Sequence, residues 1–177
     1  MTSLVELFLH NNQITTLPSQ IRTLSQLKTL TLSENNLTEI PGTIISGLVN
    51  LCILKLDNNK INSLPSEIRF LTKLKVFGCH GNQLNNVPNE IKQLVSLTEL
   101  DLSSNNLTSI PNDISQLPKL KKLFLDHNKL SSFPPTWEPS SKLLYLSLDN
   151  NQYRDISSLT AISTIKKLRR VSLKVQF

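Results

Sequence analysis

The chain has 177 residues, 19 basic against 13 acidic side chains and a formal net charge of +6. A chain of this length is ordinarily one domain, and no apolar stretch approaches the roughly 20 residues that a membrane span requires. Only Cys52 and Cys79 are cysteines, and neither lies in a cysteine-rich flank of the kind that secreted repeat proteins carry, so the composition favours a reducing compartment. Nothing near Met1 resembles a secretory signal, and we expect a cytoplasmic location, with the nucleus as an alternative.

A sequence phrase of about 23 residues repeats along the chain. In one copy Leu97, Leu100, Leu102 and Asn105 hold its first, fourth, sixth and ninth positions, and Pro111 follows a further apolar residue. Self-similarity at a fixed period is the signature of a solenoid, in which each repeat buries its apolar face against its neighbours. We therefore expect a repeat array over residues 1–167 and a terminal strand or tail over residues 168–177. The repeats begin at Leu4, Leu27, Leu51, Leu74, Leu97, Leu120 and Leu143.

Each repeat predicts the same succession of local structures. The alternating leucines predict a short strand that points them into the core, and the buried asparagine after it can satisfy backbone groups that the turn leaves unpaired. A proline then fixes φ as the chain crosses to the outer side. The Ile-x-x-Leu-x-x-Leu spacing that follows predicts one helical or 3₁₀ turn. Stacked repeats give an α/β, right-handed solenoid, with a curved parallel sheet on its concave face and short helical turns on its convex face.

The sixth repeat and the first strand depart from this scheme. In the sixth repeat Trp137 takes the Ile position and Ser140 takes a Leu position, so we expect a non-helical outer segment with Trp137 filling the core. A solenoid needs polar-faced caps, yet no capping sequence precedes Leu4. Three alternatives stay open for this end: a natural cap that has been lost, a cover supplied by another protein, or a second copy of the chain, which would make a homo-oligomer.

The repeat resembles a known family through its Leu-Pro-x-x-Ile-x-x-Leu-x-x-Leu segments, such as residues 64–74. It is similar to the intracellular leucine-rich repeats of Ras-suppressor proteins, Ras-scaffold proteins and fungal adenylyl cyclase. The match runs from Leu4 to about Leu168, and the matching residues are the structural ones. The resemblance implies a binding scaffold, often for a small GTPase or a phosphatase complex. No binding residue is carried over, because those residues lie at the variable positions.

The strand residues between the leucines face the hollow and are the candidate binding positions. Ile53 and Val76 fall on neighbouring strands beside Gly78 and predict a small apolar patch. Phe124 and Tyr145 fall on neighbouring strands close to three aspartates, a mixture that suits a basic protein or peptide partner. The candidate binding residues of the concave face are Ile53, Val76, Asp101, Phe124, Asp126, Tyr145 and Asp149.

The net positive charge does not predict nucleic-acid binding. The first seven repeats carry more acidic than basic residues on the concave side, whereas a protein that tracks phosphates gathers its basic residues into one stripe. Catalysis is not indicated either, because His10, His80 and His127 lie in separate repeats and no phosphate loop, C-x-x-C pair or activated nucleophile is present. His127 with Asp126 and Asp149 could form a weak cation site, but solvated carboxylates are far commoner. We expect no enzyme activity, cofactor or metal.

The chain ends in the letters K-V-Q-F, which resemble the K/R-V-x-F docking motif of regulatory subunits of the type-1 serine/threonine protein phosphatase. In that family the motif adds as an extended strand to a sheet edge, with its Val and Phe in apolar pockets and its basic residue near acidic groups. The resemblance implies phosphatase docking by Lys174, Val175 and Phe177. The structural alternative is a final strand with an inward face, since Val171, Leu173, Val175 and Phe177 alternate strictly.

Ser172 is a candidate phosphorylation site. It follows Arg169 and Arg170 in a pattern that resembles the R-R-x-S-hydrophobic acceptor of cyclic-AMP-dependent kinase. A phosphate would add about −1.5 to −2 charges two residues from Lys174, and we expect it to weaken docking. The alternative is a paired strand residue that kinases do not reach.

The sequence thus predicts a non-catalytic protein-interaction scaffold, with type-1 phosphatase docked on the tail and a substrate or second partner on the concave face. The alternative is a signalling scaffold whose concave face binds a Ras-like small GTPase and whose tail is structural. A homodimer joined through the open first repeat comes third. We expect neither nucleic acid nor a membrane as a partner.

Overall fold

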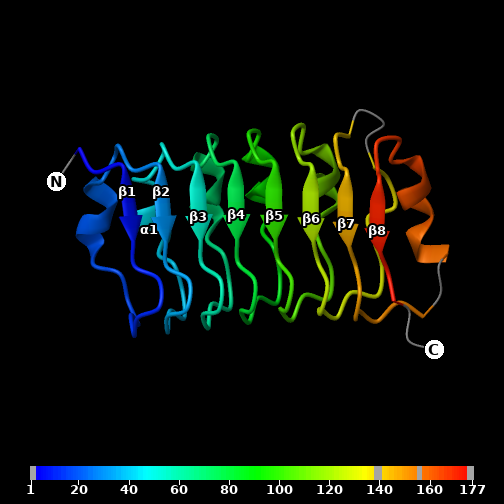
Figure 1. Ribbon diagram of the computed structural model, residues 1–177, viewed down its shortest axis with the longest axis horizontal. Coiled ribbons are helices and arrows are strands. Elements are labelled where there is room, and N and C mark those ends of the chain that lie inside the picture. The colour runs from blue at the N-terminus through cyan, green and yellow to red at the C-terminus, as the bar shows by residue number, and fades with distance from the viewer. Residues whose placement is uncertain (1–2, 138–140, 155–156, 175–177) are drawn as a thin grey trace.

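A computed structural model describes residues 3–137, 141–154 and 157–174 of the chain (Figure 1). Within these residues, eight three-residue strands form one parallel sheet in which every strand pairs with the next along the chain. The predicted α/β solenoid with a parallel sheet is therefore confirmed. The strands are β1 (Glu6–Phe8), β2 (Thr29–Thr31), β3 (Ile53–Lys55), β4 (Val76–Gly78), β5 (Glu99–Asp101), β6 (Lys122–Phe124), β7 (Tyr145–Ser147) and β8 (Arg170–Ser172).

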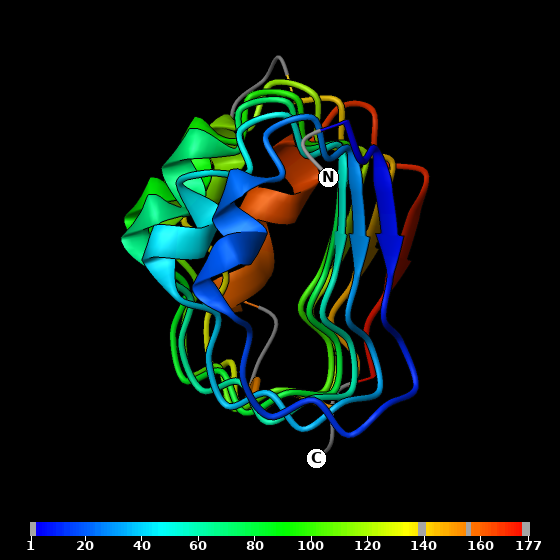
Figure 2. The same ribbon diagram turned by 90° about the vertical axis from the view of Figure 1, so that its left-hand side faces the viewer.

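Short helical segments lie on the side opposite the sheet, and the apolar core fills the space between the two layers (Figure 2). Most are single 3₁₀ turns, as the spacing predicts. A proline in extended conformation stands before each of the first five, and its fixed φ starts the turn. The segments are η1 (Ser19–Thr23), α1 (Gly42–Ile45), η2 (Ser66–Phe70), η3 (Asn89–Gln93), η4 (Asn112–Gln116) and η5 (Ser157–Thr164).

Two departures from the 23-residue period are absorbed on this outer side. The second repeat is one residue longer, and it forms the α-helical turn α1 instead of a 3₁₀ turn, with both Ile44 and Ile45 buried. The seventh repeat is two residues longer and carries the eight-residue segment η5. The strands therefore keep their register while the convex side takes up the extra residues, as insertions in solenoids do.

The sixth repeat has no helical segment within its described outer residues. Trp137 is only 4% exposed there and stacks on Phe133, with ring centroids 5.1 Å apart. Its indole N–H donates to the Ser141 hydroxyl at 2.7 Å, so the polar atom of this large side chain is satisfied inside the core. The predicted structural role of Trp137 is confirmed, whereas Ser140 lies outside the described residues.

One asparagine per repeat occupies the same position after the strand, and we call it the ladder asparagine. From the second repeat on, it is buried or partly buried and joins its repeat to the one before it. The Asn82 side-chain oxygen accepts from the Ile61 backbone N–H at 3.0 Å, and its amide donates to the Leu56 carbonyl at 3.0 Å in the preceding repeat. The same amide also reaches the carbonyls of Cys79 and His80 in its own turn. The other ladder asparagines that make both kinds of bond are Asn35, Asn59, Asn105, Asn128 and Asn151.

The residue before each ladder asparagine adopts a left-handed backbone, with φ between 52° and 64°. This conformation costs about 1–2 kcal/mol for most side chains, and only Gly81 is a glycine at this position. The side-chain bonds of the ladder asparagine offset that cost by satisfying the groups that the turn exposes. The left-handed residues are Asn11, Glu34, Asn58, Gly81, Ser104, His127 and Asn150.

Two titratable side chains among the described residues are buried in the core. Cys79 takes an inward Leu position and is fully buried, and burial together with the nearby Asp57 and Asp101 carboxylates raises the pKa of its thiol. Tyr153 takes the apolar position two residues after a ladder asparagine, and burial raises the pKa of its phenol. Its hydroxyl has no hydrogen-bond partner among the described residues, which leaves one polar atom desolvated without compensation.

Replacing a buried ladder asparagine should destabilise the fold far more than replacing the exposed first one. Asn105→Ala leaves the Leu84 N–H without its acceptor and removes one of the donors to each of three carbonyls. We expect a loss of about 3 kcal/mol in the free energy of unfolding. The Asn12 side chain bonds only to carbonyls of its own turn among the described residues, so Asn12→Ala should cost less than about 1 kcal/mol. Urea unfolding measures both, and equal losses would contradict the inter-repeat role.

Removing the orphaned hydroxyl should not weaken the core. We expect Tyr153→Phe to leave stability unchanged or raise it by about 1 kcal/mol, because the desolvation cost of the hydroxyl disappears. Tyr145→Phe is the matched control, since Tyr145 is the only other tyrosine and is half-exposed. Thermal unfolding of both variants compares them. A loss above about 1 kcal/mol for Tyr153→Phe alone would show that its hydroxyl is bonded.

Candidate functional site

The outward-facing side chains of the sheet form rows across the strands, and we call this surface the concave face. The register places residues of successive repeats side by side, because each strand pairs in parallel with the next at equivalent positions. One row contains Glu6, Thr29, Ile53, Val76, Glu99, Lys122, Tyr145 and Arg170, and the next contains Phe8, Thr31, Lys55, Gly78, Asp101, Phe124, Ser147 and Ser172.

Phe124 of β6 and Tyr145 of β7, the aromatic pair, lie together near the C-terminal end of the concave face. Their ring centroids are 5.0 Å apart at an interplanar angle of 43°, and both side chains are half-exposed. The guanidinium carbon of Arg170 lies 5.6 Å from the Tyr145 ring centroid, within cation–π range. Ser147, the register partner of Phe124, is small and buried. The aromatic pair therefore offers a firm, partly apolar surface with one cation already on it.

Three aspartates accompany the aromatic pair, and they differ in how they are bonded. Asp101 accepts from the backbone N–H of Ser103 at 3.0 Å and from its hydroxyl at 2.5 Å. Asp149 accepts from the hydroxyl of Ser172. Asp126 makes no side-chain hydrogen bond or ion pair with the described residues. None of the three joins either of the ion pairs recorded among those residues, so the negative charge of this region is not neutralised.

The predicted apolar patch lies at the middle of the sheet and is small. Ile53 and Val76 are register partners and both are half-buried. Gly78 beside them is close to the side chains of Lys55 and Asp57, which lie within 3 Å of where a Cβ atom would stand. The space that the glycine leaves is therefore filled by two charged side chains, and the patch is bordered by polar groups.

A line of hydrogen bonds near this patch joins four successive repeats, and sequence reasoning missed it. Asp57 accepts from the His80 backbone N–H at 3.0 Å and from the Ser33 hydroxyl at 3.3 Å. The Nδ1 atom of His80 lies 2.8 Å from the Ser103 hydroxyl, which in turn donates to Asp101. The only signal in the sequence is that these residues recur near 23-residue intervals. The line holds the Asp57 and Asp101 carboxylates in place on the concave face.

The predicted tail site falls partly outside the described residues. Val175 and Phe177 lie outside the described residues, while Lys174 is exposed just after β8. Val171 of β8 takes the inward position yet is 39% exposed, because β8 has a neighbouring strand on one side only. Ser172 is half-buried in the same strand and bonded to Asp149. Both docking by the tail and phosphorylation of Ser172 stay predictions.

The first repeat presents a partly open apolar end. Its core positions are half-exposed, and a cavity of about 350 Å³ opens there, lined by Leu4, Leu7, Leu9, Pro18, Gln20, Ile21, Thr23 and Leu24. The inward residues of the second repeat, such as Leu30 and Leu32, are by contrast fully buried. The prediction that a second copy of the chain covers this end stays a prediction.

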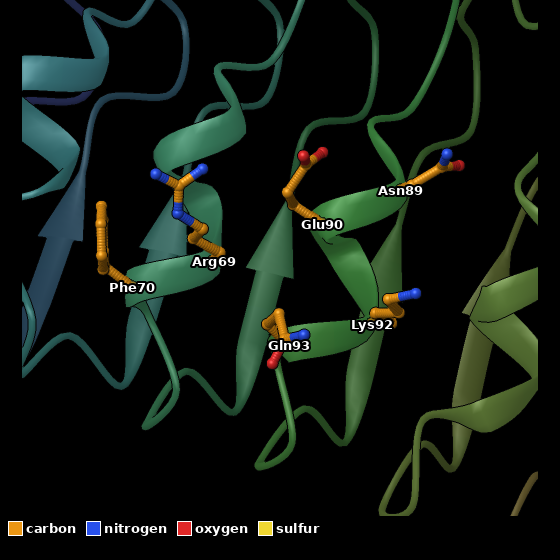
Figure 3. A pocket seen from close by; sticks show the side chains of 6 residues that line it. All are labelled: Arg69, Phe70, Asn89, Glu90, Lys92 and Gln93. Carbon is orange, nitrogen blue, oxygen red and sulfur yellow. The ribbon is translucent and has the colours of Figure 1, made fainter.

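A second cavity, of about 450 Å³, lies on the convex side between η2 and η3 (Figure 3). Arg69 stacks over the ring of Phe70 at 4.8 Å, and Lys92 pairs with Asp113 at 2.7 Å. Asn89, Glu90 and Gln93 complete the lining. Every lining side chain is exposed or half-buried, so the cavity has no buried polar group to orient a ligand.

The described residues contain no group of three or more His, Cys, Asp and Glu side chains that could hold a metal ion. The Nε2 atom of His127 lies 3.1 Å from the side-chain nitrogen of Asn150, and His80 bonds to Ser103. Within the same residues, no helix has the length and apolar character needed to cross a membrane.

Comparison with protein families identifies the repeat. Models described as "Leucine rich repeat" match residues 25–84 and 79–130, and a further one matches residues 3–24. The matched segments cover well over half of the chain, which belongs to the leucine-rich-repeat family. No curated protein matches the chain significantly.

Solved structures give the same answer for the fold. A leucine-rich-repeat protein of Leptospira interrogans is 36% identical over 98% of this chain and 43% of its own, with a TM-score of 0.88. The ectodomain of the Arabidopsis thaliana membrane receptor kinase GASSHO1/SCHENGEN3, solved in complex with CASPARIAN STRIP INTEGRITY FACTOR 2, is 30% identical over 97% of this chain and 21% of its own, with a TM-score of 0.79. The structure of PEPR1–AtPEP1 is 28% identical over 94% of this chain and 24% of its own, with a TM-score of 0.81. The chain thus spans less than half the length of each.

Proposed function

We propose that the protein is a non-catalytic scaffold that binds other proteins, with the C-terminal half of the concave face as its main binding surface. One observation carries this proposal: a half-exposed aromatic pair stands among carboxylates that no ion pair within the described residues neutralises. Aromatic side chains dominate the energy of protein interfaces, and a rigid sheet lowers the entropic cost of holding these two on binding. The similar plant receptor ectodomain was solved in complex with a factor, which agrees with a leucine-rich-repeat array as a binding module.

The first specific partner that we propose is the catalytic subunit of type-1 protein phosphatase, docked through Lys174, Val175 and Phe177. The K-V-x-F letters begin two residues after the end of β8, and Lys174 is exposed. Within the described part of the chain β8 pairs only with β7, so a partner could approach its open edge, and the motif is of the kind that adds as a strand to a partner's sheet. The phosphatase would be held on the tail while the concave face remains open to another protein.

Calorimetric titration of the phosphatase catalytic subunit into the protein tests this partner. We expect a dissociation constant in the micromolar range or tighter, weakened at least about thirtyfold by Val175→Ala/Phe177→Ala. Val171→Ala is the matched control, because it removes apolar surface from β8, outside the motif. If neither the native protein nor any variant binds the phosphatase, docking is contradicted, and Val175 and Phe177 keep only their structural interpretation.

A synthetic peptide of residues 168–177 extends the same titration to Ser172. We expect the version with phosphoserine at this position to bind the phosphatase more weakly, because the added negative charge lies close to Lys174. Equal affinity of the two peptides would contradict a phosphorylation switch and leave the docking result untouched.

The alternative partner is a Ras-like small GTPase on the concave face, and the aromatic pair favours it. Double substitution Phe124→Ala/Tyr145→Ala should abolish GTPase binding, with a loss of at least about thirtyfold in affinity, and leave phosphatase docking intact. Phe8→Ala is the matched control, because Phe8 is a 56% exposed aromatic residue in the same row at the opposite end. Equal losses for Phe8→Ala and the double variant in surface-plasmon measurements would remove the special role of the aromatic pair.

A further inference from the structure

The partner chemistry of the concave face can be specified further, in an inference that rests on the proposed function. We propose that the aromatic pair and the carboxylates of Asp126 and Asp149 bind an extended, arginine-bearing segment of a protein partner. One guanidinium of that segment lies on the Tyr145 ring in place of Arg170. Arg170 is thus an internal stand-in, a side chain of the protein itself that covers the cation position until a partner displaces it.

Arg170 already shows which ligand chemistry the Tyr145 ring accepts. Its guanidinium lies 5.6 Å from the ring centroid, which is the geometry of a cation–π contact. The side chain is exposed and makes no ion pair with the described residues, so this contact is its only recorded interaction beyond the backbone. A contact of this kind on an exposed surface is weak, and a better-placed cation can displace it.

The other basic residue beside the aromatic pair is not available for this role. Lys122 is the register partner of Tyr145 on the opposite side from Arg170, but its ammonium pairs with Glu99 at 3.0 Å. Lys122 therefore leans away from the Tyr145 ring. The aromatic pair therefore has Arg170, a cation that can be displaced, on one side. On the other side it has Lys122, a cation that is already paired.

The carboxylates next to the aromatic pair favour a second positive charge. Asp126 and Asp149 occupy equivalent positions two residues after β6 and β7, where the His127 backbone N–H donates to the Asp149 carbonyl. Like charges opposite each other on adjacent strands destabilise a sheet, and only Asp149 receives a side-chain bond, from Ser172. Lys174 follows Asp149 in this row but forms no ion pair with it. A cation from a partner would relieve the repulsion.

The spacing of these groups defines the segment that fits. Asp126 lies two residues after Phe124, just beyond the end of β6, and alternate residues of an extended chain are about 7 Å apart on one face. An extended peptide has the same repeat, so basic residues at alternate positions can reach the aromatic pair and the carboxylates together. The same carboxylates repel phosphate groups, which excludes nucleic acid from this surface.

Nuclear magnetic resonance titration with two short peptides tests the inference without requiring knowledge of the natural partner. The probe is acetyl-Gly-Arg-Ser-Arg-Gly-amide, and its charge-reversed counterpart carries Glu at both Arg positions. We expect shifts at Phe124, Tyr145 and Asp126 with the arginine peptide only. Arg170→Ala should tighten its binding about fivefold, because the aromatic pair is then uncovered.

Arg169→Ala is the matched control, because it removes the same charge from the neighbouring exposed residue, which does not lie on the ring. It should tighten binding by less than about twofold, through long-range charge alone. Asp126→Asn/Asp149→Asn should weaken binding about fivefold and gives a second readout that leaves Arg170 in place.

Equal effects of Arg170→Ala and Arg169→Ala would overturn the stand-in role, and equal binding of both peptides would overturn the cation site. The cation site would also be overturned if neither the native protein nor Arg170→Ala bound the arginine peptide. In each of these cases, the proposed function would still hold if the variant Phe124→Ala/Tyr145→Ala no longer bound a protein partner. Retention of the protein partner in that double variant would instead remove the proposed function of this surface.

Discussion

The structure depends on the two-sided hydrogen bonding of the ladder asparagine. Its side-chain oxygen accepts from the backbone of the preceding repeat while its amide donates to carbonyls of both repeats, as at Asn105. A turn with a left-handed residue at every strand exit would otherwise leave buried backbone groups unpaired. Because each bond joins sequential repeats, stability is distributed between nearest neighbours, and the ends are the least supported parts. The half-exposed apolar residues of the first repeat and Val171 in β8 show this directly.

A second consequence of the ladder is a sheet whose register does not vary. Insertions are taken up by α1 and η5 on the convex side, so equivalent positions stay side by side across all eight strands. The concave face is therefore a grid in which residue types can vary at most positions without disturbing the core. Its character changes along the array, from the small patch of Ile53 and Val76 to the acidic and aromatic region around Tyr145. This separation of core from surface allows one fold to serve many partners.

The fold and the broad layout of the candidate site could be predicted from the sequence, whereas the interactions within the site could not. Phe124 and Tyr145 were expected on neighbouring strands because their numbers differ by 21, two less than the repeat, and the register confirms the adjacency. The cation on Tyr145, the bond from Ser172 to Asp149 and the line from Asp57 to Asp101 were not foreseen. A strand position specifies a face, but a flexible side chain has several rotamers on that face, and its neighbours 23 to 25 residues away select one.

The sequence by itself determined the solenoid, the strand order, the outer 3₁₀ turns and the structural role of Trp137. It could do so because each of these follows from a local pattern that recurs at a constant period, with asparagine and proline at positions where no other residue satisfies the same backbone. The tertiary structure alone decided which carboxylates are bonded, which cations are paired and where Arg170 lies. Those outcomes depend on distances of a few ångströms between side chains from different repeats, and no period in the sequence encodes them.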